Sequence, residues 1–575
     1  MQTIFLIFFS LILFCGCSDR PAELPLSSST DTVKIDKEAI SSSAENISGN
    51  PIPYPSPSRG SEQKEPLPGK NEPTEEKSLA GNPLAEDPLT EKPAKNSARE
   101  PASDSAREPA NDPVDLLSDL AGQGSVTDRA EKSDPIADFQ NGQDPVSWNP
   151  DDPSDPIRQY VLDKAKKNRE HRKYHPILNE DAVRNSGIRY LAGKRIRLFT
   201  DLPSSPELDR FPADLDQALV RIADRYGIPQ ADLDSFSIDA FLIGKRDLFE
   251  KLGVLRNIPP FENGYSSMNR IFALDQKFLY YNRFLLIHEL VHSFMFEIFG
   301  QLEPYWFSEG SAEQTALYRL IDQKLELGII PADSEETPGF ERLRTIQKDT
   351  QKGAAKSPEE IFAFGPKDYI GTRAYAWSWA FVLFMNNHPD YKTDFRKVPY
   401  YMMLDHPNDR FKALYKNRWN ELLFDWNDFV RSFDYQYDFG KMPIDHTSGK
   451  ELDGQKDLDL SANRGWQNSG IKLEAGKSYR IRAAGRFTIA DPHGDLPCTP
   501  GGITLRYYQG YPIGQLLGIL LTSDAGSDRI FPIGNGTRIT PERSGTLYLK
   551  INDSGGRVEK NKGTFKVRIE ETDGK

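Results

Sequence analysis

The stretch that decides the fold is Phe284–Phe299, FLLIHELVHSFMFEIF, which is apolar nearly all round. A helix of this composition is expected to cross the middle of a domain, and its single polar strip consists of His288, Glu289 and His292. Histidines four residues apart project from the same face of a helix and can bind one metal ion. The glutamate next to the first histidine then lies beside the open coordination position. The spacing predicts a mononuclear zinc site for hydrolysis, with two ligands and a general base.

A histidine on an apolar helix face can instead be a hydrogen-bonded core residue. In this helix, however, two histidines and Glu289 would be buried together without a metal ion. Such burial is costly for a charged group, so the metal site is the favoured interpretation.

A second polar segment follows in Trp306–Glu313, WFSEGSAE, where a helix is expected to start around Ser308. Glu309 would face the metal from the first turn of that helix. Glu313, four residues further on, lies on the same face, where it can accept the free ring N–H of a ligating histidine. The helix dipole alone also favours a carboxylate at a helix start, but beside the histidine motif Glu309 is interpreted as the third ligand.

The ordered phrases HELVH and PYWFSEGSAE resemble the gluzincin group of zinc metallopeptidases, and the second is most similar to bacterial peptidase-MA-like proteins. The resemblance covers about residues 190 to 430 and is strong over the motif segment. It implies a zincin-like α+β fold, zinc ligands at His288, His292 and Glu309, the general base at Glu289 and a partner of a ligating histidine at Glu313. The aminopeptidase branch also has a Gly-x-Met-Glu-Asn type loop that holds the substrate amino terminus. That loop is not found here, so aminopeptidase specificity is not implied.

Residues 375–384, YAWSWAFVLF, open another apolar helix. In the resembling enzymes a tyrosine at the start of the corresponding helix donates a hydrogen bond to the tetrahedral oxyanion. The resemblance therefore gives this catalytic role to Tyr375, with Tyr369 and Arg373 as further candidates. Tyr375 could equally be an ordinary amphipathic aromatic residue at a helix end. His388, which closes this helix, is given no function.

The segments before the motif helix alternate between strand-like and helix-like periodicity. They predict a helix over residues 155–167, a strand over 194–200, a helix over 208–226, and strands over 236–243 and 270–275. Strands before the motif helix and helices after it indicate an α+β domain, placed at residues 155–445.

Residues 1–17, MQTIFLIFFSLILFCGC, form an apolar run typical of a secretory signal peptide. The closing Gly16-Cys17 resembles a bacterial lipoprotein processing site. This resemblance implies that Cys17 is lipidated and anchors the exported chain to a bacterial membrane, facing the periplasm or the cell surface. An ordinary secretion signal and an uncleaved anchor are the alternatives. A lipidated Cys17 leaves Cys498 without a partner, so no intrachain disulfide is expected.

Residues 18–150 are rich in Pro, Ser, Glu, Asp and Asn and contain few aromatic residues, which predicts a disordered linker. The linker would separate a lipid at one end from a folded enzyme at the other. The net charge of the whole chain is -13, and no basic stretch offsets it. These charges exclude nucleic acid as a partner.

From about residue 455 the composition changes to Gly-rich turns and short alternating segments. They predict a separate all-β sandwich domain over residues 455–575, with strands at 471–473, 479–483, 503–507, 547–551 and 564–569.

Several phrases of this domain, such as GTLYLKIND at 545–553 and NKGTF at 561–565, resemble bacterial galactophilic calcium lectins. Asp553 and Asn561 fall on two calcium-ligand positions of that family, so the resemblance implies a Ca²⁺ ion and a carbohydrate ligand. Lys560 and Ile489 depart from the family pattern, and a lysine ammonium does not suit calcium. The alternative is an accessory domain that packs on the peptidase or binds another polymer.

The sequence as a whole predicts an exported zinc metallopeptidase that binds one Zn²⁺ per chain and hydrolyses a peptide or protein substrate. The alternative is an inactive cell-surface binding protein that uses the metallopeptidase-like domain as a scaffold and the β-sandwich to bind carbohydrate or protein. The intact Glu289 favours the enzyme, because a scaffold has no need of the base.

Overall fold

The computed structural model describes residue 136, residue 139 and residues 148–572, apart from 171, 177, 235, 301, 403 and 523–528. The predicted leader with Cys17, and nearly all of the predicted linker, lie outside the described residues. The described chain is a mixed α+β, helix-rich part followed by a β-rich C-terminal part, as the sequence predicts. Phe139 and Trp148 are buried in the core of the helix-rich part. The folded chain therefore begins before residue 150, the predicted end of the linker.

A five-stranded sheet with the strand order β1-β2-β3-β5-β4 supports the helix-rich part. Its strands are β1 (Arg189–Ala192), β2 (Ile196–Thr200), β3 (Ile238–Ile243), β4 (Gly264–Ser267) and β5 (Arg270–Leu274). The three inner strands are parallel, and β1 and β4 run antiparallel at the two edges. All side chains of β3 are buried, as expected for the centre of a sheet covered on both faces. The predictions for the inner strands are confirmed, whereas the short, half-buried edge strands were not predicted.

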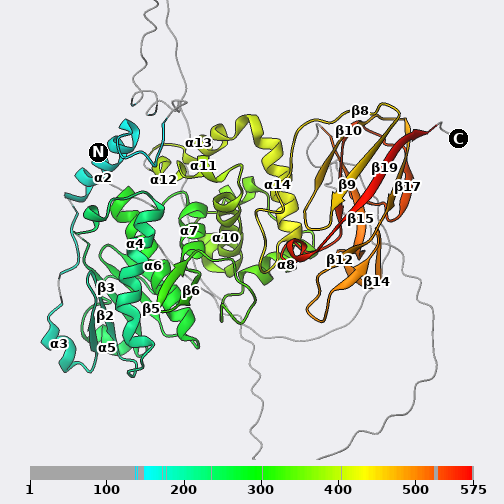
Figure 1. Cartoon of the computed structure of the whole chain (residues 1–575). Helices are drawn as coiled ribbons and strands as arrows, with labels where there is room; N and C mark the ends of the chain where they lie inside the picture. Colours follow the sequence, from blue (N-terminus) through cyan, green and yellow to red (C-terminus); the bar gives the residue numbers. More distant parts are fainter. Residues whose placement is uncertain are drawn as a thin grey trace, which may run out of the picture. The chain divides into compact units, whose positions relative to one another are not determined.

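Helices α4 (Phe211–Arg225) and α6 (Leu279–Phe299) pack against this sheet (Figure 1), with α2 (Pro156–Glu170) against α6. Helix α6 carries the histidine motif, and nearly all of its side chains are buried. It begins at Leu279, earlier than the predicted Phe284. It ends at Gly300, whose left-handed φ of 87° closes the helix where a side chain would be strained.

The chain after α6 is mostly helical. Its longer helices are α7 (Tyr305–Ala316), α8 (Arg342–Gln351), α10 (Thr372–Asn387) and α14 (Trp419–Ser432). The shorter ones are α9 (Pro358–Phe362), η3 (Pro366–Ile370), α11 (Lys392–Phe395), α12 (Val398–Tyr401) and α13 (Pro407–Leu414), and a hairpin of β6 (Tyr318–Ile321) and β7 (Lys324–Leu327) follows α7. Helices α7 and α10 approach closely at Gly310, where any side chain would collide with the backbone carbonyl of Ser378.

The C-terminal β region, residues 450–572, contains two larger sheets that share one core. The first comprises β14 (Gly501–Tyr508), β15 (Tyr511–Leu521), β18 (Gly545–Ile551), β10 (Gln467–Leu473) and β8 (Lys450–Glu451), with β16 (Phe531–Pro532) paired to β15. The second comprises β17 (Gly536–Ile539), β11 (Ser478–Ala484), β19 (Thr564–Thr572) and β9 (Gln455–Ser461). The five predicted strands are all present. Buried residues of both sheets, among them Leu547 and Val567, form the shared core.

A small sheet of β12 (Phe487–Ile489) and β13 (Leu496–Cys498) adjoins this core. It contains Cys498, which is a free, buried thiol. Burial raises the pKa of this thiol to about 11.

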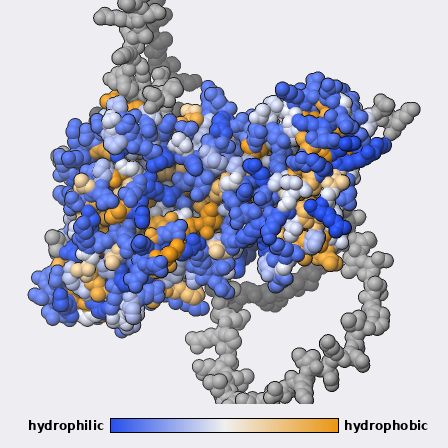
Figure 2. Space-filling view, in the orientation of Figure 1, coloured by the Kyte–Doolittle hydropathy of each residue, from blue (hydrophilic) through white to orange (hydrophobic). Residues whose placement is uncertain are grey.

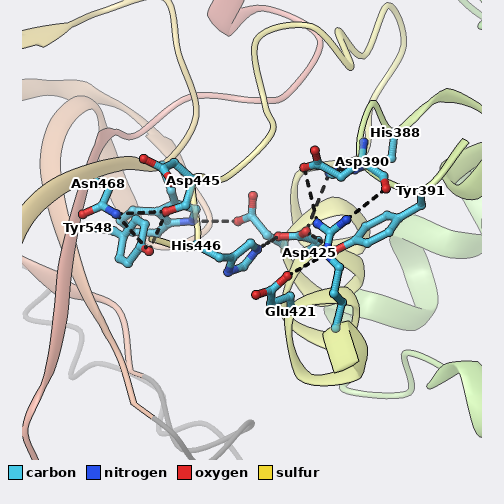
Figure 3. A network of polar contacts seen from close by, with 12 residues as sticks. His388, Asp390, Tyr391, Glu421, Asp425, Asp445, His446, Asn468 and Tyr548 are labelled. Atoms are coloured by element: carbon cyan, nitrogen blue, oxygen red, sulfur yellow. Dashed lines mark hydrogen bonds and ion pairs between the residues drawn. The ribbon is translucent and has the colours of Figure 1, made fainter. Parts of the chain in front are cut away.

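A network of polar groups joins helix α14 to the segment that leads into the β region (Figure 3). Asp425 of α14 accepts hydrogen bonds from the Tyr391 hydroxyl at 2.5 Å and from His446 at 2.8 Å. Tyr548 of β18 donates to the backbone carbonyl of Asp445 at 2.7 Å. His388 lies 3.7 Å from Asp425, and burial lowers its pKa to about 3. His388 is therefore neutral, and it contributes to this network as a buried structural residue.

A second aspartate of α14, Asp428, reaches the β region itself. It accepts a hydrogen bond from Trp466 Nε1 at 2.8 Å and pairs with Lys550 Nζ at 3.4 Å. The Lys550 ammonium also lies 4.5 Å from the centre of the Trp466 ring, a cation–π contact. Both charged side chains are buried, so each depends on the other for compensation.

The face of the molecule in Figure 2 is mainly hydrophilic, with small hydrophobic patches. Leu320 and Ile321 of β6 are among the exposed large apolar side chains. Within the residues that the structure describes, no helix is both long and apolar enough to cross a membrane.

Lys550→Met is expected to lower the free energy of unfolding by ~3 kcal/mol, because it leaves the buried Asp428 without its cation. Lys566→Met is the matched control, since Lys566 forms an exposed pair with Asp459 in the same region. Chemical denaturation of the full chain measures both variants. Equal losses of stability would contradict a special role for the buried pair.

Candidate metal centre

Three ligand atoms from two helices converge on one point. Nε2 of His288 and Nε2 of His292 are 3.0 Å apart, and Oε2 of Glu309 lies 3.3 Å from the first and 3.2 Å from the second. Donor atoms about 2.0–2.1 Å from a tetrahedral zinc ion are roughly 3.3 Å apart, so these spacings fit such an ion. Among the described residues this is the one group of three or more His, Cys, Asp or Glu side chains close enough to hold a metal. The three predicted ligands are therefore brought together.

The local structure explains the convergence. His288 and His292 are one turn apart on α6 and point to α7, which packs against α6 and supplies Glu309. Helix α7 begins at Tyr305 rather than at the predicted Ser308, so Glu309 lies in the second turn and not the first. The helix dipole acts mainly within the first turn, so it does not account for a carboxylate at this position.

The charge state of Glu309 suits a ligand. Burial acts to raise the pKa of this carboxyl, but the His292 charge and hydrogen bonds from both histidines hold it well below its usual range. Glu309 is therefore ionised at neutral pH, as metal coordination requires.

Glu289 is buried beside the three ligands. Burial raises its pKa to about 8; the His292 charge opposes this shift and the neighbouring Glu309 adds to it. The Ser266 hydroxyl of β4 donates a hydrogen bond to the Glu289 carboxylate. Gly264, also in β4, leaves room for Glu289, because a side chain there would collide with its Oε1. At a pKa of about 8 Glu289 is mostly protonated at neutral pH, and a cation bound beside it would lower the pKa and free the carboxylate to accept a proton.

Glu313 faces His288, as the sequence predicts, but His288 Nδ1 makes no hydrogen bond within the described residues, so the predicted N–H bond is not formed. Its Oε1 is 3.6 Å from Nδ1 of His288. Its other partner, which was not predicted from the sequence, is Arg342 of α8, which donates from Nε to Oε2 at 2.9 Å and from Nη2 to Oε1 at 3.0 Å. Nothing near Arg342 in the sequence signals this role, because the two residues belong to different helices and meet only in the fold.

Tyr375 lies beside His288, and Tyr369 lies beside Tyr375. The Tyr375 ring centre is 6.2 Å from that of His288 and 5.0 Å from that of Tyr369. Burial and the charges of Glu309 and Glu289 raise the pKa of Tyr375 well above its usual value, so its hydroxyl keeps its proton.

Their hydroxyl groups differ in their partners. The Tyr369 hydroxyl shares a hydrogen bond with Ser378 Oγ at 2.7 Å, whereas that of Tyr375 makes none within the described chain. Arg373, the third candidate, points to α8 and pairs with Asp349 at 2.9 Å. Tyr375 is therefore the candidate whose hydroxyl has no hydrogen-bond partner within the described chain.

Asp553 and Asn561, the predicted calcium ligands of the β region, are buried side by side. Asn561 Nδ2 donates to Asp553 Oδ2 at 2.8 Å, and the backbone N–H of Ser554 donates to Asp553 Oδ1 at 2.8 Å. Close by, Arg506 forms an ion pair with Asp491. Both oxygens of Asp553 thus accept hydrogen bonds from the protein itself.

No family model matches this chain, and no curated protein does either. Among solved structures, the N-terminal domain of EclA, described as a PllA-like lectin, is similar at 21% identity over 20% of this chain and 95% of its own, with a TM-score of 0.16. Yeast LTA4 hydrolase in complex with bestatin is similar at 15% identity, with a TM-score of 0.26. That match covers 42% of this chain and 38% of the hydrolase. The function of the chain is therefore inferred from its own residues.

Glu289→Gln is expected to stabilise the chelator-treated protein at pH 8 relative to the unsubstituted chain. The pKa of about 8 in the native state is above the ordinary value of 4.5 for a glutamate. The native state therefore holds a proton that the unfolded state has lost, and between these values the free energy of unfolding falls by at most about 1.4 kcal/mol per pH unit. The stability contribution of protonated Glu289 is complete below pH 4.5 and is lost as the pH rises towards 8.

Thermal unfolding of both proteins from pH 4.5 to 9 measures this difference, which should grow with pH. Exposed Glu335 supplies the control substitution Glu335→Gln, which should follow the unsubstituted chain. A difference that stays constant over the whole pH range would contradict the shifted pKa.

Proposed function

We propose that this chain is a zinc-dependent metallopeptidase. The observation that carries the proposal is the convergence of His288, His292 and Glu309, with Glu289 close enough for their charges to shift its pKa. Two histidines, one glutamate and an adjacent carboxylate are the donor set of hydrolytic zinc sites, in which the protein supplies three ligands and leaves one position open. A closed structural site would supply a fourth protein ligand.

The chain's own residues supply the acid–base chemistry of the mechanism. Zinc, when bound, lowers the pKa of a coordinated water molecule and polarises the scissile carbonyl. Glu289 accepts the proton of the attacking water and passes it to the leaving amine. The Tyr375 hydroxyl donates a hydrogen bond to the oxyanion of the tetrahedral intermediate.

The edge strand β4 supports a peptide as the substrate. It is the last strand in the sheet order, so one of its edges has no strand partner among the described residues. Gly264 and Ser266 of this strand adjoin Glu289. An extended peptide that pairs with the free edge of β4 would lie beside the base, with its backbone hydrogen-bonded to the strand.

Location and further partners are part of the same proposal. The apolar leader supports export, and Gly16-Cys17 supports a lipid anchor in a bacterial membrane, with the metal centre facing the periplasm or the cell surface. The β region would bind a carbohydrate or a protein that directs the enzyme to its substrate. A calcium ion bound to Asp553 would have to displace the hydrogen bonds that Asn561 and Ser554 donate to its two oxygens.

Glu289→Gln should keep about one zinc ion per chain and lose roughly 10²–10⁴-fold in peptide hydrolysis, because it removes the base and none of the ligands. Metal analysis tests the retention of zinc, and digestion of a peptide library tests the loss of hydrolysis. Chelation should abolish hydrolysis by the unsubstituted chain, and added zinc should restore it.

Full hydrolysis by Glu289→Gln would refute the assignment of the base. A chain that binds one zinc ion and cleaves no peptide in the library would instead favour the alternative, a binding protein with a metallopeptidase-like scaffold.

Tyr375→Phe should lower kcat by roughly 10²-fold with little change in KM, because the oxyanion forms only during the reaction. Tyr369→Phe is the matched control, since its hydroxyl already bonds to Ser378, and it should stay close to the unsubstituted chain. Steady-state kinetics on one cleaved peptide compares the two. The opposite ranking would assign the oxyanion donor to Tyr369.

A further inference from the structure

Arg342 opens helix α8 and is buried against the metal centre. Its guanidinium binds Glu313 in a fork, with Nε to Oε2 at 2.9 Å and Nη2 to Oε1 at 3.0 Å. Two parallel hydrogen bonds fix both the position and the rotation of a carboxylate, which a single contact does not. The fork therefore sets the direction in which Glu313 presents its oxygens.

The oxygen that Glu313 presents belongs to the metal centre. Oε1, which accepts from Arg342 Nη2, is also 3.6 Å from Nδ1 of His288, and Nε2 of the same ring is a ligand atom. This distance is longer than a hydrogen bond, so the contact is electrostatic: the carboxylate favours a proton on Nδ1 and so leaves Nε2 free to bind a metal. The chain of contacts runs from Arg342 through Glu313 and His288 to the metal position.

A second face of Arg342 touches the candidate oxyanion donor. The guanidinium carbon lies 5.6 Å from the centre of the Tyr375 ring, within cation–π range, and Nη2 is 3.4 Å from the Tyr281 hydroxyl. Helix α8 is also tied to α10 at Asp349, which accepts from Trp377 Nε1 at 3.0 Å and from Arg373 at 2.9 Å. Helix α8 thus holds both α7, through Glu313, and the first turns of α10, which carry Tyr375.

Arg342 also compensates the charge of a buried carboxylate. Glu289, Glu309 and Glu313 are three carboxylates in one buried region, and Arg342 is the cation that touches one of them directly. Burial acts to lower the pKa of Arg342, but the charges of Glu313 and Tyr281 and the hydrogen bonds to both side chains together raise it. The guanidinium is therefore a permanent counter-charge for Glu313.

We propose that Arg342 is a positioning residue of the metal centre: by holding Glu313 against His288 and supporting the Tyr375 ring, it sets zinc affinity and turnover without touching the metal. The inference rests on the proposed zinc centre. It differs from a purely structural ion pair, which would hold α7 and α8 together and leave the zinc affinity of a folded variant unchanged.

Arg342→Lys keeps the charge and loses the fork, and Arg342→Met loses both. The first test measures the zinc dissociation constant of the full chain by competition with a chromophoric chelator, with no substrate present. Arg342→Lys should weaken zinc binding by about tenfold and Arg342→Met by up to about 100-fold. Cobalt(II) in place of zinc should show a changed visible absorption band in both variants, because the His288 ring loses its fixed orientation.

Arg283→Lys is the matched control. Arg283 is a buried arginine on the metal helix itself, paired through Nε with Asp214 at 3.1 Å. Arg283→Lys should lower the unfolding temperature and leave the zinc dissociation constant within about twofold, since Arg283 contacts none of the proposed ligands. Equal losses of zinc affinity in Arg283→Lys and Arg342→Lys would mean that any destabilised fold binds zinc less tightly. That result would overturn the proposal.

A double-substitution cycle tests the route through Glu313. Arg342→Met should weaken zinc binding in the original chain but have little further effect in the Glu313→Gln background, because the group that it positions is already altered. The same loss in both backgrounds would overturn the proposal. The double variant Glu313→Gln/Arg342→Met carries neither charge and so leaves no unpaired ion, which keeps the cycle measurable if Arg342→Met alone fails to fold.

Kinetics separates this inference from the proposed function. If the chain hydrolyses peptides, Arg342→Lys should lower kcat more than it raises KM, because Tyr375 and the metal act on the transition state. If the chain binds zinc and hydrolyses nothing, the proposed function fails while the zinc dissociation constants still decide the role of Arg342. Unchanged zinc affinity in folded Arg342 variants would overturn the role of Arg342 and leave the metallopeptidase proposal intact.

Discussion

The structure of the helix-rich part depends on one electrostatic constraint, the burial of three carboxylates around a single point. Glu289, Glu309 and Glu313 surround the two histidines in the apolar interior between α6 and α7. One guanidinium, that of Arg342, offsets one of the three charges. The two that remain equal the charge of one zinc ion, so a divalent cation would make the region neutral. The raised pKa of Glu289 fits the same balance, because a proton can partly replace the metal charge.

Site residues that lie close together in the sequence could be predicted from it. Site residues that come from separate elements and meet only in the fold could not. His288, Glu289 and His292 are related by helix periodicity, so their spacing alone placed them on one face. Glu309 and Glu313 share one helix and could be added by the same rule, although the helix begins earlier than predicted. Arg342, Ser266 and Gly264 come from other elements, and no periodicity connects them to the motif.

In the β region, short sequence motifs predicted the strands but not a metal site. Its strands could be predicted, because alternation and glycine turns are local signals, whereas a calcium site needs several oxygen ligands from separate loops. Asp553 and Asn561 are adjacent, as the resemblance implies, but they bond to each other. The contacts of α14 with this region were likewise not predictable, since Asp428, Trp466 and Lys550 are polar or amphipathic residues whose burial depends on the packing of two regions.

The buried thiol of Cys498 has a consequence for the chemistry that the folded protein can undergo. With a pKa of about 11, only roughly one molecule in ten thousand carries the thiolate at neutral pH, and the thiolate is the form that attacks disulfides. Burial of the sulfur in β13 further limits access by oxidants. The β region is therefore expected to keep the same covalent structure in oxidising and in reducing surroundings.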